Sequence, residues 1–122
     1  MANEKILIVD DEKELVDMVT FRLQSQEYDV HVAYSGEEAL EKVKQESYQL
    51  ILLDVMMPGI DGFEVLRRLR EDPKTRPIPV IMLTCKGEAS SIFKTQELGG
   101  TDYLIKPFVP QTLLRLIKKY IL

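Results

Sequence analysis

The segment Leu50–Arg70, with the sequence LILLDVMMPGIDGFEVLRRLR, indicates the fold class of this protein more clearly than any other stretch. Its first four residues form the most apolar run of the chain, which predicts a strand that is buried on both faces and lies centrally in a sheet. A Pro58-Gly59 turn follows. Asp61 and Glu64 then have the spacing of a capping box, so an amphipathic helix is predicted to begin there.

The same alternation of a short apolar run with a longer amphipathic segment occurs five times along the chain. The predicted strands are Lys5–Val9, Asp29–Ala33, Leu50–Leu53, Val80–Thr84 and Tyr103–Ile105. The predicted helices are Glu14–Gln24, one capped by Ser35, one beginning at Asp61, Ser90–Leu98 and Pro110–Tyr120. Strands that alternate with helices need crossover connections, so we expect an α/β fold with a doubly wound parallel sheet. The length of 122 residues suits one domain, residues 1–122.

Composition excludes several classes of function. The formal net charge is −4 and the pI about 5.1, which argues against direct nucleic-acid binding by this segment. No apolar run approaches the ~20 residues of a membrane helix, so no membrane association is expected. The single cysteine, Cys85, rules out an internal disulfide and fits a reducing compartment. No signal peptide is visible at the amino end, and we expect a cytoplasmic protein.

Polar residues that could take part in a chemical reaction follow the predicted strands. Asp10 and Asp11 come after the first strand, Asp54 after the third, Thr84 at the end of the fourth and Lys106 after the fifth. In parallel sheets ligands bind beyond the carboxyl ends of the strands, at a switch point in strand order. These five side chains are therefore expected to converge on one edge of the sheet.

The types of residue in this cluster point to phosphoryl chemistry. Three carboxylates in one pocket repel each other, and a divalent cation with oxygen ligands, Mg²⁺ or Mn²⁺, relieves the repulsion. A carboxylate beside such a cation can act as a nucleophile toward phosphorus. Lys106 can neutralise phosphoryl oxygens, and Thr84 can donate a hydrogen bond to them. Taken singly, an Asp-Asp pair can be a helix-start signal and an Asp before Pro-Gly a turn residue; their convergence favours a site.

Four segments make the chain resemble a known family over essentially its whole length. They are ILIVDDE (6–12), LILLDVMMPGIDGFEVLRRLR (50–70), PVIMLTCKG (79–87) and DYLIKPF (102–108). Together they are similar to the receiver domain of two-component response regulators, the CheY-like superfamily. The resemblance implies a flavodoxin-like (βα)5 fold with strand order 2-1-3-4-5. It also implies a signalling domain that is not an enzyme beyond its own phosphorylation and dephosphorylation.

The resemblance assigns the phosphoacceptor and the metal ligands. Asp54 would accept a phosphoryl group from a histidine kinase or a histidine phosphotransfer protein. Asp11 would ligate Mg²⁺ directly and Asp10 largely through water, with Asp54 as a third ligand. The backbone carbonyl of Met56 would complete the protein's share of the ligands.

The resemblance also implies a switch. Lys106 would contact the phosphoryl group, and its bond to Pro107 would be cis. On phosphorylation the Thr84 hydroxyl would move toward the phosphoryl group, and the ring of Tyr103 would swing inward. The expected output surface is the face formed by the fourth helix, fifth strand and fifth helix. An output domain or partner protein would bind there, and phosphorylation would favour a homodimer through the same face.

A few residues depart from the family pattern or need a simpler interpretation. Cys85 follows Thr84, where relatives usually carry a small residue; it would either narrow access to the phosphoryl group or simply be a small buried hydrophobe. Val109 stands where a helix-capping Ser is common, a loss of about 1 kcal/mol. His31 is interpreted as a sheet-edge residue. The arginines of the third helix, Arg67, Arg68 and Arg70, are interpreted as a solvated face.

Other functions fit the residues less well. An aspartyl-phosphate phosphatase of the haloacid-dehalogenase type needs a second acid two residues after Asp54, where Met56 stands. A flavin-binding protein needs a phosphate loop where this chain has acidic residues. A phosphorylation-independent interaction module would be expected to lack a member of the cluster. Two versions of the switch stay open: a stand-alone receiver, and the amino-terminal part of a longer regulator.

Overall fold

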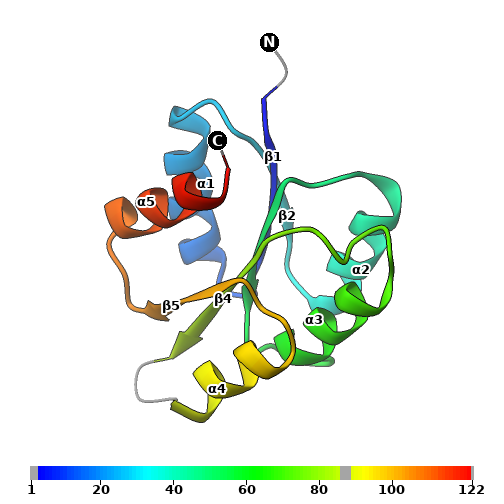
Figure 1. Ribbon diagram of the computed structural model, residues 1–122. Helices are drawn as coiled ribbons and strands as arrows, with labels where there is room; N and C mark the ends of the chain where they lie inside the picture. The colour runs from blue at the N-terminus through cyan, green and yellow to red at the C-terminus, as the bar shows by residue number, and fades with distance from the viewer. Residues whose placement is uncertain (1–2, 86–88, 122) are drawn as a thin grey trace.

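The computed structural model describes residues 3–85 and 89–121 and shows five strands and five helices in strict alternation (Figure 1). The strands are β1 (Lys5–Val9), β2 (Asp29–Ala33), β3 (Leu50–Asp54), β4 (Val80–Cys85) and β5 (Asp102–Lys106). The helices are α1 (Lys13–Ser25), α2 (Gly36–Gln45), α3 (Gly62–Glu71), α4 (Ala89–Glu97) and α5 (Pro110–Tyr120). The strands pair in parallel in the order β2-β1-β3-β4-β5. The predicted fold class, strand order and central third strand are therefore confirmed.

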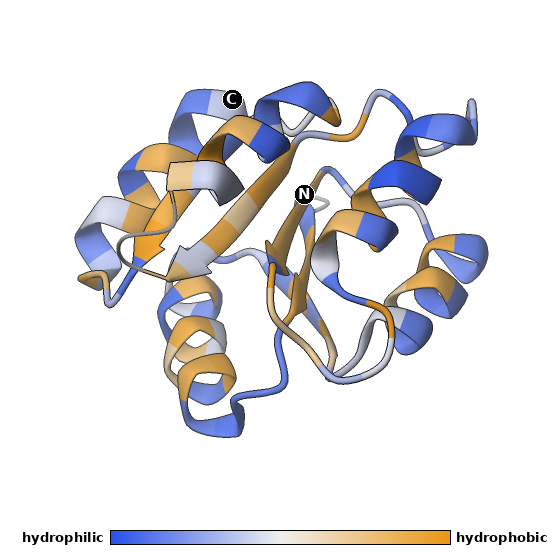
Figure 2. Cartoon of the chain, turned by 90° about the horizontal axis from the view of Figure 1, so that it is seen from below, coloured by the Kyte–Doolittle hydropathy of each residue, from blue (hydrophilic) through white to orange (hydrophobic). Residues whose placement is uncertain are grey.

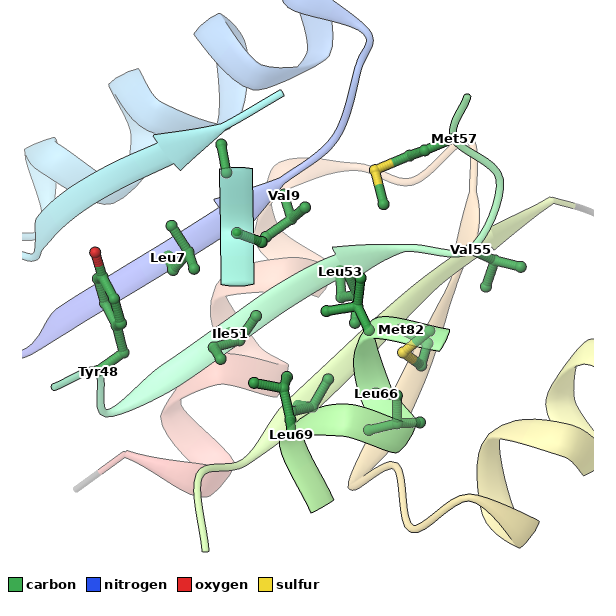
Figure 3. Close-up of a cluster of buried hydrophobic side chains, with 14 residues drawn as sticks. Leu7, Val9, Tyr48, Ile51, Leu53, Val55, Met57, Leu66, Leu69 and Met82 are labelled. Atoms are coloured by element: carbon green, nitrogen blue, oxygen red, sulfur yellow. The ribbon is translucent and has the colours of Figure 1, made fainter. Parts of the chain in front are cut away.

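Two apolar clusters fill the space on either side of the sheet. Successive residues of a strand point to opposite faces, so Leu7 and Val9 join one cluster while Ile6 and Ile8 join the other. The first cluster packs under α2 and α3. Figure 3 shows Leu66 and Leu69 of α3 beside strand residues such as Leu53. The second packs under α1 and α5, which lie on the opposite face of the sheet in Figure 1. Every residue of β3 is buried, as its continuous apolar run predicts.

Hydropathy follows this layering. In Figure 2 the strands are mostly hydrophobic, and the surrounding helices alternate between hydrophobic and hydrophilic residues. Within residues 3–85 and 89–121, no helix combines the length and the apolar character that crossing a bilayer requires. The polar residues Asp10 and Asp54 therefore differ from the apolar residues of the buried strands that they follow or end.

Helix starts follow the predicted capping chemistry. The Ser35 hydroxyl accepts a hydrogen bond from the Glu38 amide at 3.1 Å, and the Asp61 carboxylate accepts one from the Glu64 amide at 2.9 Å. Val109 precedes α5 without a side-chain cap, as predicted. Strands β3, β4 and β5 each extend one residue further than predicted at their carboxyl ends, because the backbone ladder continues through the residues there.

The predicted solvated arginine face is wrong at one position. Arg67 and Arg68 are exposed and pair with Glu64. Arg70 is half-buried instead, and its guanidinium donates to the carbonyls of Gly99 and Ile78, both at 2.8 Å. Helix α3 is thereby tied to the turn that leads into β5. Spacing along one helix cannot reveal this contact, since its partners come from two other loops.

The position of His31 agrees with the predicted sheet edge. It lies on β2, the outermost strand on that side. One ring nitrogen lies 2.9 Å from the Tyr48 hydroxyl. Carboxylate oxygens of Asp29 and Glu46 lie 3.4 and 3.3 Å from the ring nitrogens, so the contacts of His31 are with residues near the start of β2 and β3, in keeping with a structural role.

Candidate functional site

The carboxyl ends of β1, β3 and β5 bring three charged side chains together. Asp10 follows β1 and is fully buried, and Asp54 ends β3 with 4% of its surface exposed. Lys106 ends β5, and 11% of its side chain is exposed. Because the three strands are parallel, residues distant in sequence meet at the same sheet edge. The predicted convergence of Asp10, Asp54 and Lys106 is therefore confirmed.

The Lys106 ammonium lies at the centre of this cluster. Its Nζ is 2.8 Å from Asp10 Oδ2 and donates a hydrogen bond of 2.8 Å to Glu12 Oε1. Its contact with Asp54 Oδ1 is longer, at 3.3 Å. One cation thus serves three carboxylates, and the pocket keeps an excess of negative charge at neutral pH.

Burial and charge shift the ionisation of both central groups. Burial raises the pKa of Asp54 to about 6, and the neighbouring Asp10 charge adds to the effect, although Lys106 and the Met56 amide act against it. Burial alone would lower the pKa of Lys106, but its contacts with Asp10 and Glu12 outweigh burial and raise it. Lys106 therefore stays charged, whereas Asp54 is an unusually poorly stabilised carboxylate.

The donor set suits a hard divalent cation. Asp10, Glu12 and Asp54 each offer an oxygen, and these oxygens lie within 4.8 Å of one another. Oδ2 of Asp10 is buried, and the Lys106 ammonium lies 2.8 Å from it. An all-oxygen, anionic set is the kind that Mg²⁺ prefers. The residues present therefore fit the cation that the sequence predicted.

The acidic group differs in one member from the predicted set. Asp11 is exposed and lies outside the group, while Glu12 takes part in it through Lys106. A direct role of Asp11 in metal binding stays a prediction. Sequence reasoning missed Glu12 because it directly follows the Asp pair and looks like a helix-start residue. Glu12 is in fact the N-cap of α1, with extended backbone angles. The only signal for it was the run of three consecutive acids.

The loop after Asp54 is packed closely against the start of α3. The Gly62 amide donates to the Val55 carbonyl at 2.9 Å. A Cβ added to Gly62 would lie 2.1 Å from the carbonyl oxygen of Asp54, much closer than any real contact. Only glycine allows this approach, which holds the phosphoacceptor candidate in place. Sequence reasoning gave Gly62 no role.

The two predicted switch residues lie on neighbouring strands. Thr84 is buried, and its hydroxyl donates to the Cys85 carbonyl at 3.5 Å, the outer limit for a hydrogen bond. Tyr103 is half-buried on β5, where it packs against the cluster under α2 and α3. It also lines a groove of about 280 Å³ between β5 and α5. The β4–β5 register pairs Met82 with Tyr103 and Thr84 with Ile105.

Two further predictions concern the same end of the sheet. The Lys106–Pro107 peptide bond is cis, as the resemblance implies. Cys85 is exposed at the end of β4, so its interpretation as a small buried hydrophobe is wrong. Leu83 points to the same side of β4 and is buried, so Cys85 is exposed because it is the last residue of the strand.

One cavity lies away from this cluster. It measures about 550 Å³ and is lined by residues 43–49, 74, 75 and 77–79. These segments precede β3 and β4, so the cavity lies at the amino ends of the strands. The charged cluster lies at their carboxyl ends.

Comparison with known proteins places the chain in one family. Residues 6–118 match the family described as the response regulator receiver domain. The chain is 43% identical over 116 residues to the regulatory protein VanRc of Enterococcus gallinarum, which covers 95% of this chain and 49% of VanRc. It is also 43% identical over 114 residues to the transcriptional regulatory protein ResD of Bacillus subtilis, covering 93% of this chain and 46% of ResD. The chain thus spans about half the length of these curated relatives.

Solved structures agree with the sequence matches. The chemotaxis protein CheY4 of Vibrio cholerae superposes with a TM-score of 0.93 and 34% identity, over 98% of this chain and 100% of that one. The receiver domain of the sensor histidine kinase PA1611 of Pseudomonas aeruginosa superposes with a TM-score of 0.90 and 29% identity, over 98% of each chain. That structure holds a magnesium ion in its active-site cleft. The match over residues 6–118, the strand order and the buried cluster at the strand ends agree, and this chain belongs to the response regulator receiver domain family.

Proposed function

We propose that this chain is a phosphorylation-dependent switch in which Asp54 accepts a phosphoryl group. The observation that carries the proposal is the position of Asp54. It is a buried carboxylate at the end of the central strand, 3.3 Å from a lysine that is itself held by two other acids. A poorly stabilised carboxylate beside a fixed cation is suited to attack on phosphorus followed by charge neutralisation.

The transfer step needs no further base. An Asp54 carboxylate oxygen attacks the phosphorus of a phosphohistidine on the kinase or phosphotransfer protein. The new O–P bond forms as the P–N bond breaks, and the imidazole nitrogen leaves with the electron pair and takes up a proton. Hydrolysis reverses the change: water attacks phosphorus, the Asp54 carboxylate is restored and inorganic phosphate leaves. Lys106 neutralises phosphoryl oxygens in both steps.

The acidic residues account for a requirement for a divalent cation. Asp10, Asp54, the exposed Asp11 and the carbonyl of Met56 are the groups proposed to hold Mg²⁺. When bound, Mg²⁺ supplies charge stabilisation to the phosphoryl oxygens and offsets the repulsion among the carboxylates. Two buried carboxylates, Asp10 and Asp54, share the single Lys106 ammonium, and this excess of negative charge supports the assignment.

Thr84 and Tyr103 are proposed to transmit the change. A phosphoryl group adds about −1.5 to −2 charge and strong acceptor oxygens. The Thr84 hydroxyl makes only a 3.5 Å hydrogen bond to the Cys85 carbonyl, so little free energy is lost when it turns toward those oxygens. Its departure leaves room for the neighbouring Tyr103 ring. The phosphoryl group thus biases an equilibrium between two packings of β4 and β5.

The proposed output surface is the face of α4, β5 and α5. Large apolar side chains from this face are exposed, namely Phe93 on α4, Ile105 on β5 and Val109 just before α5. Such a surface fits an output domain or a partner protein. It also fits a second copy of this chain, in a homodimer that forms on phosphorylation. The similarity to ResD and VanRc supports an output in regulation, carried out by a part of the protein beyond this receiver segment. A cytoplasmic location, where phosphodonors reside, belongs to the same proposal.

The decisive experiment is phosphorylation by a small donor. The protein is incubated with acetyl phosphate and Mg²⁺, and its intact mass is recorded beside that of Asp54→Asn. We expect a gain of one phosphoryl group that requires Mg²⁺ and is absent in the variant. A folded wild-type protein that gains nothing, or a variant that gains equally, would contradict the assignment of Asp54.

A further inference from the structure

Glu12 is the member of the pocket that the proposed function leaves without a role. It follows Asp10 and Asp11 and reaches across the pocket to Lys106, 94 residues away in the chain. Its backbone is fixed on both sides, because its amide donates to Asp10 Oδ1 at 2.9 Å and its carbonyl accepts from the Val16 amide at 3.0 Å. The side chain therefore extends from a well-defined point at the start of α1.

The three acids hold Lys106 under different conditions. Asp10 is fully buried, so water cannot replace the Lys106 ammonium as the partner of its carboxylate. Asp54 is buried and makes the longest contact. Glu12 makes a 2.8 Å hydrogen bond, yet 61% of its side chain is exposed. Water can replace Lys106 at Glu12 at little free-energy cost. Glu12 is therefore the partner that Lys106 can most readily give up.

We propose that Glu12 is a positioning residue that holds the Lys106 ammonium in the unphosphorylated protein and competes with the phosphoryl group for it. The inference rests on the proposed function of Asp54. When a phosphoryl group is on Asp54, Lys106 turns toward its oxygens and the Glu12 carboxylate turns to solvent. Glu12 thus lowers the affinity of the pocket for the phosphoryl group and favours the resting state.

The consequence is measurable with a phosphoryl mimic. Beryllium fluoride is titrated into the protein at saturating Mg²⁺. Its binding is monitored through the amide chemical shifts of residues in β3 and β5. We expect Glu12→Gln to bind it about two- to fivefold more tightly, as expected for an ion pair with one exposed partner. Glu12→Asp retains the charge but is one methylene shorter, so it loses the hydrogen bond, and its affinity should lie between those of wild type and Glu12→Gln.

Glu14→Gln is the matched control. Glu14 lies in the first turn of α1 and is exposed, and its removal changes the net charge by the same amount. We expect its affinity for beryllium fluoride to equal that of wild type. An equal gain in Glu14→Gln and Glu12→Gln would show a general charge effect and overturn the proposal. The affinity for Mg²⁺ alone is a further check. If Glu12→Gln binds Mg²⁺ about tenfold more weakly than wild type does, Glu12 is a direct metal ligand and the proposal is overturned.

A second measurement needs neither metal nor phosphate. The Nζ resonance of Lys106 and the hydrogen exchange of its ammonium are recorded by NMR in EDTA. We expect a shifted resonance and faster exchange in Glu12→Gln, and no change in Glu14→Gln. An unchanged Lys106 signal in Glu12→Gln would overturn the inference even if Asp54 is phosphorylated. Conversely, the Lys106 signal could change in Glu12→Gln as expected while wild type takes up no phosphoryl group. That result would contradict only the proposed function.

Discussion

Replacing Asp54 with Asn should stabilise the metal-free protein at neutral pH. Burial and the Asp10 charge raise the pKa of Asp54 from 3.8 to about 6, so the folded protein binds this proton more tightly than the unfolded chain does. Ionisation of Asp54 therefore lowers stability as pH rises from about 4 to about 6, and the full penalty is present above pH 6. A shift of about two pKa units corresponds to about 3 kcal/mol. Asn removes the charge and nearly conserves the volume.

The assay is urea unfolding in EDTA, followed by far-ultraviolet circular dichroism, since the chain has no Trp. We expect the free energy of unfolding of Asp54→Asn to exceed that of wild type by about 2–3 kcal/mol at pH 7.5. The difference should be well under 1 kcal/mol at pH 4, where Asp54 is protonated in the folded protein and roughly half protonated in the unfolded chain. Saturating Mg²⁺ should stabilise wild type and narrow the difference at pH 7.5. Asp17→Asn, which removes an exposed carboxylate, is the control and should change stability little.

The result that refutes this reasoning is specific. If Asp54→Asn is no more stable than wild type at pH 7.5 in EDTA, Asp54 is not a strained carboxylate and Lys106 fully compensates its burial. If the gain is the same at pH 4 and pH 7.5, its origin is not ionisation. Either outcome would remove the electrostatic basis for treating Asp54 as an activated acceptor.

Substitutions at three further positions test other parts of the structure. Val109→Ser supplies the missing cap of α5 and should raise the free energy of unfolding by about 0.5–1 kcal/mol in the same urea assay. Gly62→Ala places a methyl group against the Asp54 carbonyl, so we expect a loss of about 1–3 kcal/mol and slower phosphorylation by acetyl phosphate. Arg70→Ala leaves the Gly99 carbonyl without its guanidinium partner and should speed amide exchange at residues 99–101, measured by NMR. Arg70→Lys should restore little, because one ammonium cannot copy the planar fork.

Much of the pocket was predictable because its residues end strands. A buried parallel strand is apolar along its length, so a carboxylate at its carboxyl end stands out, as Asp10 and Asp54 do. Lys106 was predictable by the same rule once five strands were recognised. Glu12 was not, because its role depends on the reach of a flexible side chain across the pocket. The exposure of Cys85 depended in turn on the way one strand end faces solvent.

The sequence by itself determined the order of strands and helices, the parallel sheet and the strand ends at which the charged residues lie. Periodicity and capping are local, and each can be recognised within a short segment. Tertiary structure alone decided which groups share Lys106, that Arg70 ties α3 to the turn before β5, and that the pKa of Asp54 is raised. These properties depend on distances between segments far apart in the chain and on exclusion of water, which no local pattern encodes.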